Sequence, residues 1–184
     1  MSEIFLAFVG NANSGKSTSA KHLAKELDLP VTTGSNILTK LADERGIRLG
    51  AREDYAKFQK SLRDELGPAF LMDISLRGAS GRGVLIDGLR NYNDSDLFQS
   101  VGGITVAIWC PVEVRFRRGL ERSSPKDAAT FEDFIAAEAD EYADPDPRGI
   151  HLLQIMQMAD YHIDGNQPPE SVITQANQIL ELVT

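Results

Sequence analysis

Hydrophobic positions along the chain follow two alternating patterns. Short continuous apolar runs are typical of parallel strands covered on both faces, and they predict strands at 4–9, 30–32, 83–87, 104–109 and 161–163. Apolar residues that recur every three or four positions predict helices at 15–27, around 37–42, 53–78 with a break at 67–68, 95–101, 112–122, 131–142, 150–159 and 169–183. This alternation predicts an open, mostly parallel α/β sheet with right-handed crossovers.

Length and composition narrow the class of protein. The 184 residues, 42% of them hydrophobic, suit a single domain over residues 1–184. The formal net charge of −8, without a block of Lys or Arg, argues against a polymeric nucleic-acid partner. No apolar run approaches the roughly 20 residues of a membrane span, and the first residues lack a basic leader, so we expect a cytoplasmic protein without a membrane partner. The single Cys110 cannot form an intrachain disulfide.

One segment matches the phosphate-loop pattern G-x-x-x-x-G-K-[ST] in full, between a predicted strand and a predicted helix. Its glycines permit backbone angles that turn N–H groups onto one anion, and the following helix adds positive potential. Lys16 is expected to reach the β- and γ-phosphates of ATP, and Ser17 to offer its hydroxyl to Mg²⁺. The predicted cofactor-binding residues of this segment are Gly10, Asn11, Ala12, Asn13, Ser14, Gly15, Lys16, Ser17 and Thr18.

The phosphate loop indicates nucleotide binding without fixing the reaction. The strand at 83–87 ends on Asp87, at the edge where open α/β sheets bind ligands, so Asp87 is the expected magnesium partner. A motor ATPase commonly places a Glu next to activate water, whereas Gly88 follows here, which favours transfer to a substrate. Arg90 is a candidate phosphate clamp. The alternatives are a turn residue at the strand end for Asp87 and an ordinary exposed arginine for Arg90.

Arginines gather on the predicted helix at 112–122. Arg115, Arg118 and Arg122 share one helical face, with Arg117 beside them. Such a row can neutralise charge on transferring phosphoryl oxygens. A solvated face paired with neighbouring glutamates is the alternative. We take Arg118 and Arg122 as catalytic candidates and leave Arg115 and Arg117 open.

Four ordered blocks, at 10–17, 86–90, 118–122 and 159–166, resemble the adenylate-kinase-like and dephospho-CoA-kinase-like P-loop proteins over nearly the whole chain. The segment from 33 to 68 is most similar to archaeal dephospho-CoA kinase-related proteins and also resembles phage deoxynucleoside monophosphate kinases. The resemblance implies a P-loop NTPase three-layer sandwich with strand order 2-3-1-4-5. It also implies two mobile insertions, an acceptor-binding one at about 33–78 and a lid at about 122–148.

The resemblance also assigns roles to residues. Adenine would lie between Arg118 and the loop at 165–168, which contains Asn166, and the lid would carry Arg122 and Arg148. The acceptor-binding residues it implies are Ser35, Arg45, Arg48, Arg52 and Arg90. Exposed arginines that need no function are the alternative for this group.

Two features depart from simple expectation. The block at 87–90 is one residue shorter than the Asp-Gly-Phe-Pro-Arg block of adenylate kinase, which puts the acceptor geometry near Arg90 in question. The segment at 144–147, Asp-Pro-Asp-Pro, is expected to be a stiff acidic hinge, with a magnesium or substrate role as the alternative.

The sequence therefore predicts γ-phosphoryl transfer from ATP with Mg²⁺ to a nucleotide or nucleotide-like acceptor, with a (deoxy)nucleoside monophosphate as first candidate. Dephospho-CoA kinase is one alternative, in which Asp87 would orient or deprotonate a ribose hydroxyl. A nucleotide-dependent ATPase or regulator and a binding module for another polyphosphate are the others. The expected partner is a small-molecule acceptor, and the expected state is a monomer or homodimer.

Overall fold

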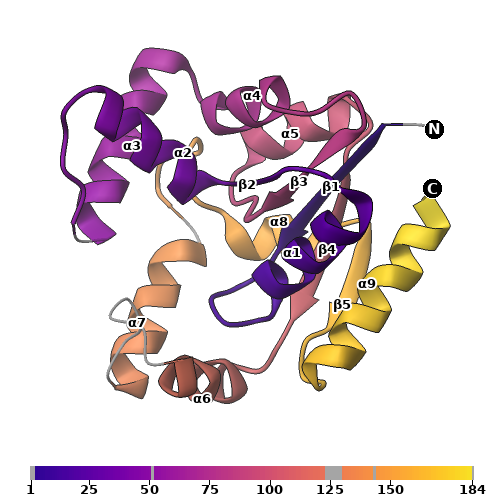
Figure 1. The fold of residues 1–184 in the computed structure, drawn as a ribbon. Coiled ribbons are helices and arrows are strands. Elements are labelled where there is room, and N and C mark those ends of the chain that lie inside the picture. The colour runs from indigo at the N-terminus through magenta and orange to yellow at the C-terminus, as the bar shows by residue number, and fades with distance from the viewer. Residues whose placement is uncertain (1–2, 51, 123–129, 143, 184) are drawn as a thin grey trace.

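The computed structural model describes residues 3–50, 52–122, 130–142 and 144–183, without the side chains of residues 52, 53 and 140. In this part of the chain five strands form one parallel sheet of order β2-β3-β1-β4-β5, as predicted (Figure 1). The strands are β1 (Ile4–Val9), β2 (Val31–Thr33), β3 (Gly83–Asp87), β4 (Ile104–Trp109) and β5 (Tyr161–Asp164). The helices are α1 (Lys16–Leu27), α2 (Gly34–Glu44), α3 (Arg52–Leu66), α4 (Phe70–Arg77), α5 (Tyr92–Ser100), α6 (Val112–Arg122), α7 (Phe131–Tyr142), α8 (Leu152–Gln157) and α9 (Pro169–Val183).

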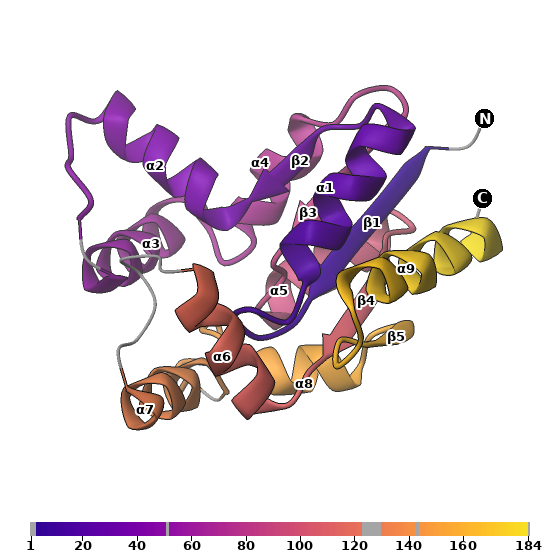
Figure 2. The same cartoon turned by 60° about the horizontal axis from the view of Figure 1, so that its bottom comes forward.

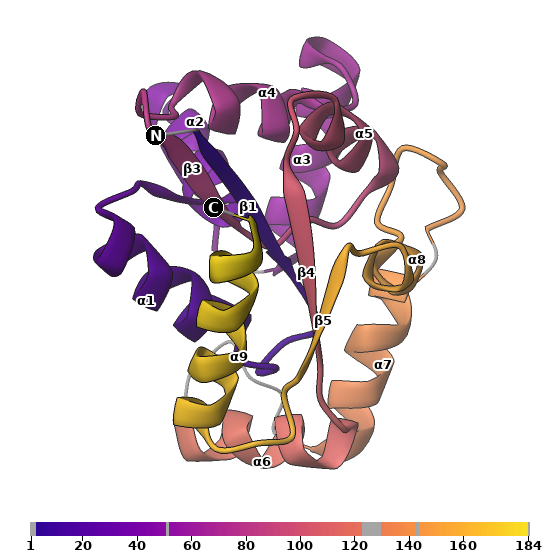
Figure 3. The ribbon, with the colours of Figure 1, turned by 90° about the vertical axis from the view of Figure 1, so that its right-hand side faces the viewer.

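The sheet lies between two layers of helices (Figure 3). Alternate residues of β1 separate the two faces: Leu6 and Phe8 pack in a core with α1 and α9, and Ala7 and Val9 in a core with α4, α5 and α8. A third cluster, which includes Leu62, joins α2, α3 and α4 beside the β2 edge. The predicted three-layer sandwich is therefore confirmed.

The structure corrects the bounds of two predicted helices and confirms a predicted break. We expected the fifth helix at 95–101, but α5 begins at Tyr92 because the Asn91 side chain accepts from the backbone N–H of Asp94 at 2.8 Å. The Asn91 amide in turn donates to the Asp94 carboxylate. The expected break at 67–68 lies between α3 and α4, where Gly67 has a φ of 98°. The helix expected at 150–159 is shorter, spanning Leu152–Gln157.

The strands all end at the same edge of the sheet, because every pairing is parallel. Helices α6 and α7 lie at this edge, with α6 next to the β1–α1 loop when the molecule is turned (Figure 2). The start of β1 and the end of α9 lie at the opposite edge (Figure 1). Within the described ranges, no helix has both the length and the apolar character needed to cross a bilayer.

Candidate nucleotide-binding site

The phosphate loop joins β1 to α1 and has the left-handed backbone that its glycines predict. The φ angles are 156° at Gly10, 62° at Asn13 and 108° at Gly15. A Cβ atom on Gly10 would lie 2.7 Å from the Ser14 Oγ and 2.9 Å from the Ile108 carbonyl oxygen. Only glycine therefore fits at the start of this loop without displacing the end of β4.

Lys16 is half-buried at the start of α1, and its Nζ donates to the Asn11 carbonyl at 3.1 Å. Burial is the main reason that the pKa of Lys16 falls from 10.5 to about 8. The positive charge of Arg90 lowers this pKa further, Asp87 raises it, and Arg122 lowers it again. Two of the predicted catalytic arginines therefore lie within electrostatic reach of Lys16, and a phosphate anion would stabilise the charged lysine.

Asp87 ends β3 beside Phe8 of β1 and Thr33 of β2. Its Oδ1 is buried without a hydrogen-bond partner among the residues the structure describes, and the same holds for the Ser14 Oγ. Buried polar atoms normally have partners, so the Ser14 oxygen in the loop and the Asp87 oxygen at the end of β3 are acceptors that a bound ligand could use. Mg²⁺ prefers carboxylate, hydroxyl and phosphate oxygens, so Asp87 and the exposed Ser17 fit a magnesium-nucleotide complex.

The predicted base-binding residues lie together. The Arg118 Nη2 donates to the Gln167 carbonyl at 3.0 Å, which places this arginine against the loop after β5. Within that loop the Asn166 N–H donates to the Asp164 carboxylate at 2.8 Å. The Gly165 N–H donates to the Trp109 carbonyl at 2.6 Å, which fixes the loop to the end of β4.

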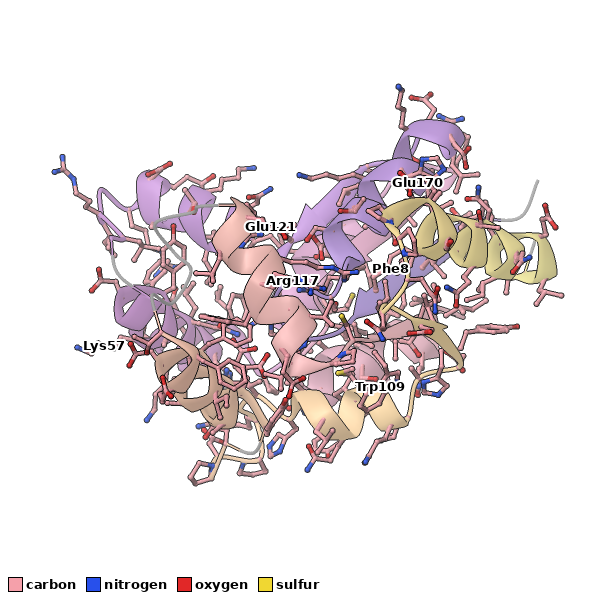
Figure 4. All side chains as sticks on the ribbon, turned by 90° about the horizontal axis from the view of Figure 1, so that it is seen from below. Phe8, Lys57, Trp109, Arg117, Glu121 and Glu170 are labelled. Carbon is pink, nitrogen blue, oxygen red and sulfur yellow. The ribbon has the colours of Figure 1, made fainter. Side chains whose placement is uncertain are left out.

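Arg115, whose role the sequence left open, is the most enclosed arginine of α6. Its side chain is 4% exposed and forms a two-pronged ion pair with Glu138 of α7, with an Nη2 to Oε2 distance of 2.8 Å. Arg117, by contrast, is exposed. Seen from below, α6 with Arg117 and Glu121 crosses the view between Lys57 on one side and Glu170 on the other (Figure 4).

Arg90 and Arg122 differ in their surroundings. The Arg90 Nη1 lies 3.0 Å from the Oε1 of Glu141 in α7. Arg122 is exposed at the end of α6. The structure thus brings together Lys16, Asp87 and both of these arginines, and it adds carboxylates of α7 that the sequence analysis did not assign.

The acceptor-side arginines lie elsewhere. Arg45 of α2 forms a two-pronged pair with Glu65 of α3, at 2.7 and 2.8 Å. Arg48 is exposed and lines a groove of about 310 Å³ between α2 and α3. Within the described ranges, no hydrogen bond or ion pair of Arg45 or Arg48 reaches the phosphate loop or the end of β3. The Ser35 hydroxyl lies 3.1 Å from that of Thr33, and the Arg52 side chain lies outside the described residues.

Arg63 of α3 is a residue that the sequence analysis missed. It is 7% exposed and lies within electrostatic reach of two carboxylates, Asp94 and Asp146. Its charge lowers the pKa values of Asp94 and Asp146, although burial is dominant at Asp94 and raises that pKa to about 6. Arginine is seldom enclosed to this degree without a nearby counter-charge, and these two carboxylates supply it. Arg63 therefore lies on α3 near the start of α5 and the segment after α7.

The acidic segment after α7 is held by its own hydrogen bonds. The Asp146 N–H donates to the Asp144 carboxylate at 2.8 Å, and the Arg148 N–H donates to the Asp146 carboxylate at 2.9 Å. The hydrogen bond from the Arg148 side chain is the main cause that lowers the pKa of Asp146 to about 2. Arg148 also pairs with Asp64 of α3 at 2.9 Å. These contacts hold the segment in a fixed turn, and its role as a hinge stays a prediction.

Comparisons with known proteins identify the family of the chain. A family model described as an AAA domain matches residues 6–142. The chain belongs to this family. A UPF0200/UPF0201 protein of Archaeoglobus fulgidus is 29% identical over 187 residues, covering 95% of this chain and 54% of the relative. A UPF0200 protein of Sulfurisphaera tokodaii is 25% identical over 184 residues, covering 97% and 96%. The chain thus spans about half the length of the first relative and nearly all of the second.

Solved structures of small-molecule kinases share the fold of this AAA-domain chain. Shikimate kinase from Aquifex aeolicus has a TM-score of 0.59 at 20% identity, covering 97% of this chain and 96% of that one. A gluconokinase from Sinorhizobium meliloti has a TM-score of 0.56 at 16% identity, covering 98% and 93%. The chain therefore has a P-loop kinase fold. The narrower resemblance to nucleoside-monophosphate and dephospho-CoA kinases stays a prediction.

Proposed function

We propose that the protein transfers the γ-phosphoryl group of ATP, with Mg²⁺, to a small nucleotide or nucleotide-like acceptor, with a (deoxy)nucleoside monophosphate as first candidate. The observation that carries this proposal is the position of Asp87 beside Phe8 at the end of β1, within electrostatic reach of Lys16, as Arg90 also is. The next residue after Asp87 is Gly88, so no carboxylate stands there to activate water. This arrangement supports transfer to an acceptor over hydrolysis.

The protein's own residues have distinct tasks in this proposal. The N–H groups of residues 10–17 and Lys16 bind the phosphates, and Ser17 and Asp87 hold the magnesium. Bound MgATP supplies the transferable phosphoryl group. Arg90 and Arg122 stabilise the negative charge that spreads over the phosphoryl oxygens. Arg118 and the loop at 165–168 hold the base.

The acceptor is proposed to lie between the end of β3 and α3. Arg63 of α3 supports this placement because its side chain is enclosed, whereas Arg45 is engaged with Glu65 at the surface. An anionic group on the acceptor would satisfy the Arg63 guanidinium. We therefore propose Arg63 with Arg90 as the acceptor-binding arginines, ahead of Arg45, Arg48 and Arg52.

A hydroxyl acceptor is the second candidate. The orphan Oδ1 of Asp87 is an available base that could take the proton of a hydroxyl during transfer. Dephospho-CoA, through its ribose hydroxyl, fits this chemistry, and the names of the structural neighbours shikimate kinase and gluconokinase suggest small hydroxylated acceptors as well.

An assay of ADP release with MgATP tests the proposal against a panel of ribo- and deoxynucleoside monophosphates, dephospho-CoA and shikimate. Strong stimulation of ADP release by a nucleoside monophosphate supports the first candidate. Stimulation only by dephospho-CoA or shikimate supports the second. Slow ADP release at the same rate with every acceptor contradicts both candidates and favours an ATPase or regulator. Lys16→Ala should abolish release, whereas Lys21→Ala, an exposed lysine one turn along α1, should keep it.

A further inference from the structure

Three consecutive positions of the phosphate loop are hydrogen-bonded to helices α6 and α7. The Asn11 amide donates to the Tyr142 hydroxyl at 3.1 Å. The Ala12 carbonyl accepts from the Arg115 Nη1 at 3.4 Å, and the Asn13 amide donates to the Arg115 carbonyl at 3.1 Å. The variable part of the loop, between its two glycines, is therefore fixed from outside.

Arg115 is the centre of these contacts, and Glu138 is its counterion. The Arg115 Nε donates to the Cys110 carbonyl at 2.8 Å, and its guanidinium lies 5.5 Å from the centre of the Phe134 ring. Both terminal nitrogens donate to the Glu138 carboxylate, whose Oε2 also accepts from Tyr142 at 3.4 Å. A two-pronged pair fixes the plane as well as the position of a guanidinium.

This geometry restrains the loop in two ways. The Ala12 carbonyl is held toward Arg115, so it cannot turn inward, where its negative dipole would repel a phosphate. Asn13 has a φ of 62°, a conformation that side chains other than glycine adopt at a cost, and its hydrogen bond to the Arg115 carbonyl offsets that cost.

We propose that Glu138 and Tyr142 of α7 are positioning residues for the phosphate loop. Glu138 holds Arg115 in the plane that reaches Ala12 and Cys110, and Tyr142 one turn later holds Asn11. Helix α7 thereby keeps the loop in its phosphate-binding shape, and it is part of the nucleotide site in addition to covering it. This inference rests on the proposed use of the loop for nucleotides.

Two variants test the inference without leaving a buried charge unpaired. Arg115→Met together with Glu138→Leu removes both charges and keeps apolar volume, an exchange that is often neutral for stability. We expect its urea midpoint to stay close to that of wild type while the Kd for ADP, measured by titration calorimetry, rises about tenfold. Tyr142→Phe, which removes one oxygen, should raise the Kd about threefold. Glu132→Gln, on the exposed first turn of α7, is the matched control and should change neither value.

Hydrogen exchange of the amides at residues 10–16 separates positioning from general destabilisation. Faster exchange confined to this loop, with the sheet strands unchanged, is expected in both variants. A wild-type Kd for ADP in folded Tyr142→Phe and in the double variant would overturn the inference, and if the double variant fails to fold, Tyr142→Phe decides alone. If the wild-type protein itself binds no ADP, the proposed function fails and the positioning role fails with it.

Discussion

The Nη1 of Arg90 and the Oε1 of Glu141 lie 3.0 Å apart, so the segment after β3 is joined to the last turn of α7. Glu141 is buried, whereas Arg90 is partly exposed. The carboxylate that neutralises Arg90 therefore competes with any phosphate for the same guanidinium.

Removing this competitor should strengthen anion binding. In Glu141→Gln the amide keeps the shape of the side chain but attracts Arg90 less, so we expect the Kd for ATP to fall about threefold. Titration calorimetry at constant ionic strength measures the change, with Glu132→Gln as control. Weaker binding in the variant would instead show that Glu141 orients Arg90 toward the nucleotide.

Nucleotide affinity should depend on the charge of Lys16. Its pKa is about 8 in the free protein, so the Kd for ADP should be level below pH 8 and rise above it, by up to about tenfold per pH unit. The same shift makes the unfolding free energy increase between about pH 8 and 10.5, because only the unfolded chain holds the lysine proton there. A pH series of calorimetric titrations checks this dependence. Lys16→Ala should bind weakly at every pH without the rise, and the same rise in that variant would assign the titration to another group.

The close contacts around Gly10 predict that one added methyl group weakens nucleotide binding strongly. Gly10→Ala would place its Cβ against the Ser14 Oγ and the Ile108 carbonyl, so the loop must shift and the Kd for ADP should rise more than about tenfold. Gly81→Ala is the matched control, because a Cβ there meets nothing within 4 Å. Equal affinities in the two variants would contradict the loop geometry.

Substitution of Arg63 should change the KM of the acceptor and leave the KM for ATP unchanged. Arg63→Met removes a buried charge that attracts Asp94 and Asp146, so we expect stability to fall by about 1 kcal/mol while the KM of the acceptor found in the panel rises about tenfold. The KM for ATP should not change. Steady-state kinetics and urea unfolding measure both effects, with the exposed Arg77→Met as control. An unchanged acceptor KM would place the acceptor away from α3.

The sheet and the phosphate loop could be predicted because their signals are local. Apolar runs such as 4–9 and 104–109 identify buried strands, and the spacing from Gly10 to Ser17 identifies the loop between β1 and α1. The boundary of α5 was missed because it depends on the side-chain pair of Asn91 and Asp94. In a sequence, those two residues are equally compatible with a turn.

The arginines were harder to predict, because burial and pairing arise from tertiary contacts. Arg115 and Arg118 share a face of α6, yet only the packing of α7 encloses Arg115 against Glu138. Arg45 belongs to the acceptor-side segment, yet Glu65 on the next helix engages it. Arg63 has no distinctive sequence context, and its enclosure follows from the approach of α5 and the segment after α7. The spacing of Glu138 and Glu141 on one helical face was the available signal for the role of α7.

The parallel sheet has a practical consequence for handling the molecule. The start of β1 and the end of α9 both lie at the edge away from α6 and α7 (Figure 1). An affinity tag, a fluorescent label or a sensor surface attached before β1 or after α9 therefore leaves the edge with the phosphate loop open to solution. Immobilised protein can thus be titrated with ligands without the attachment itself blocking the loop.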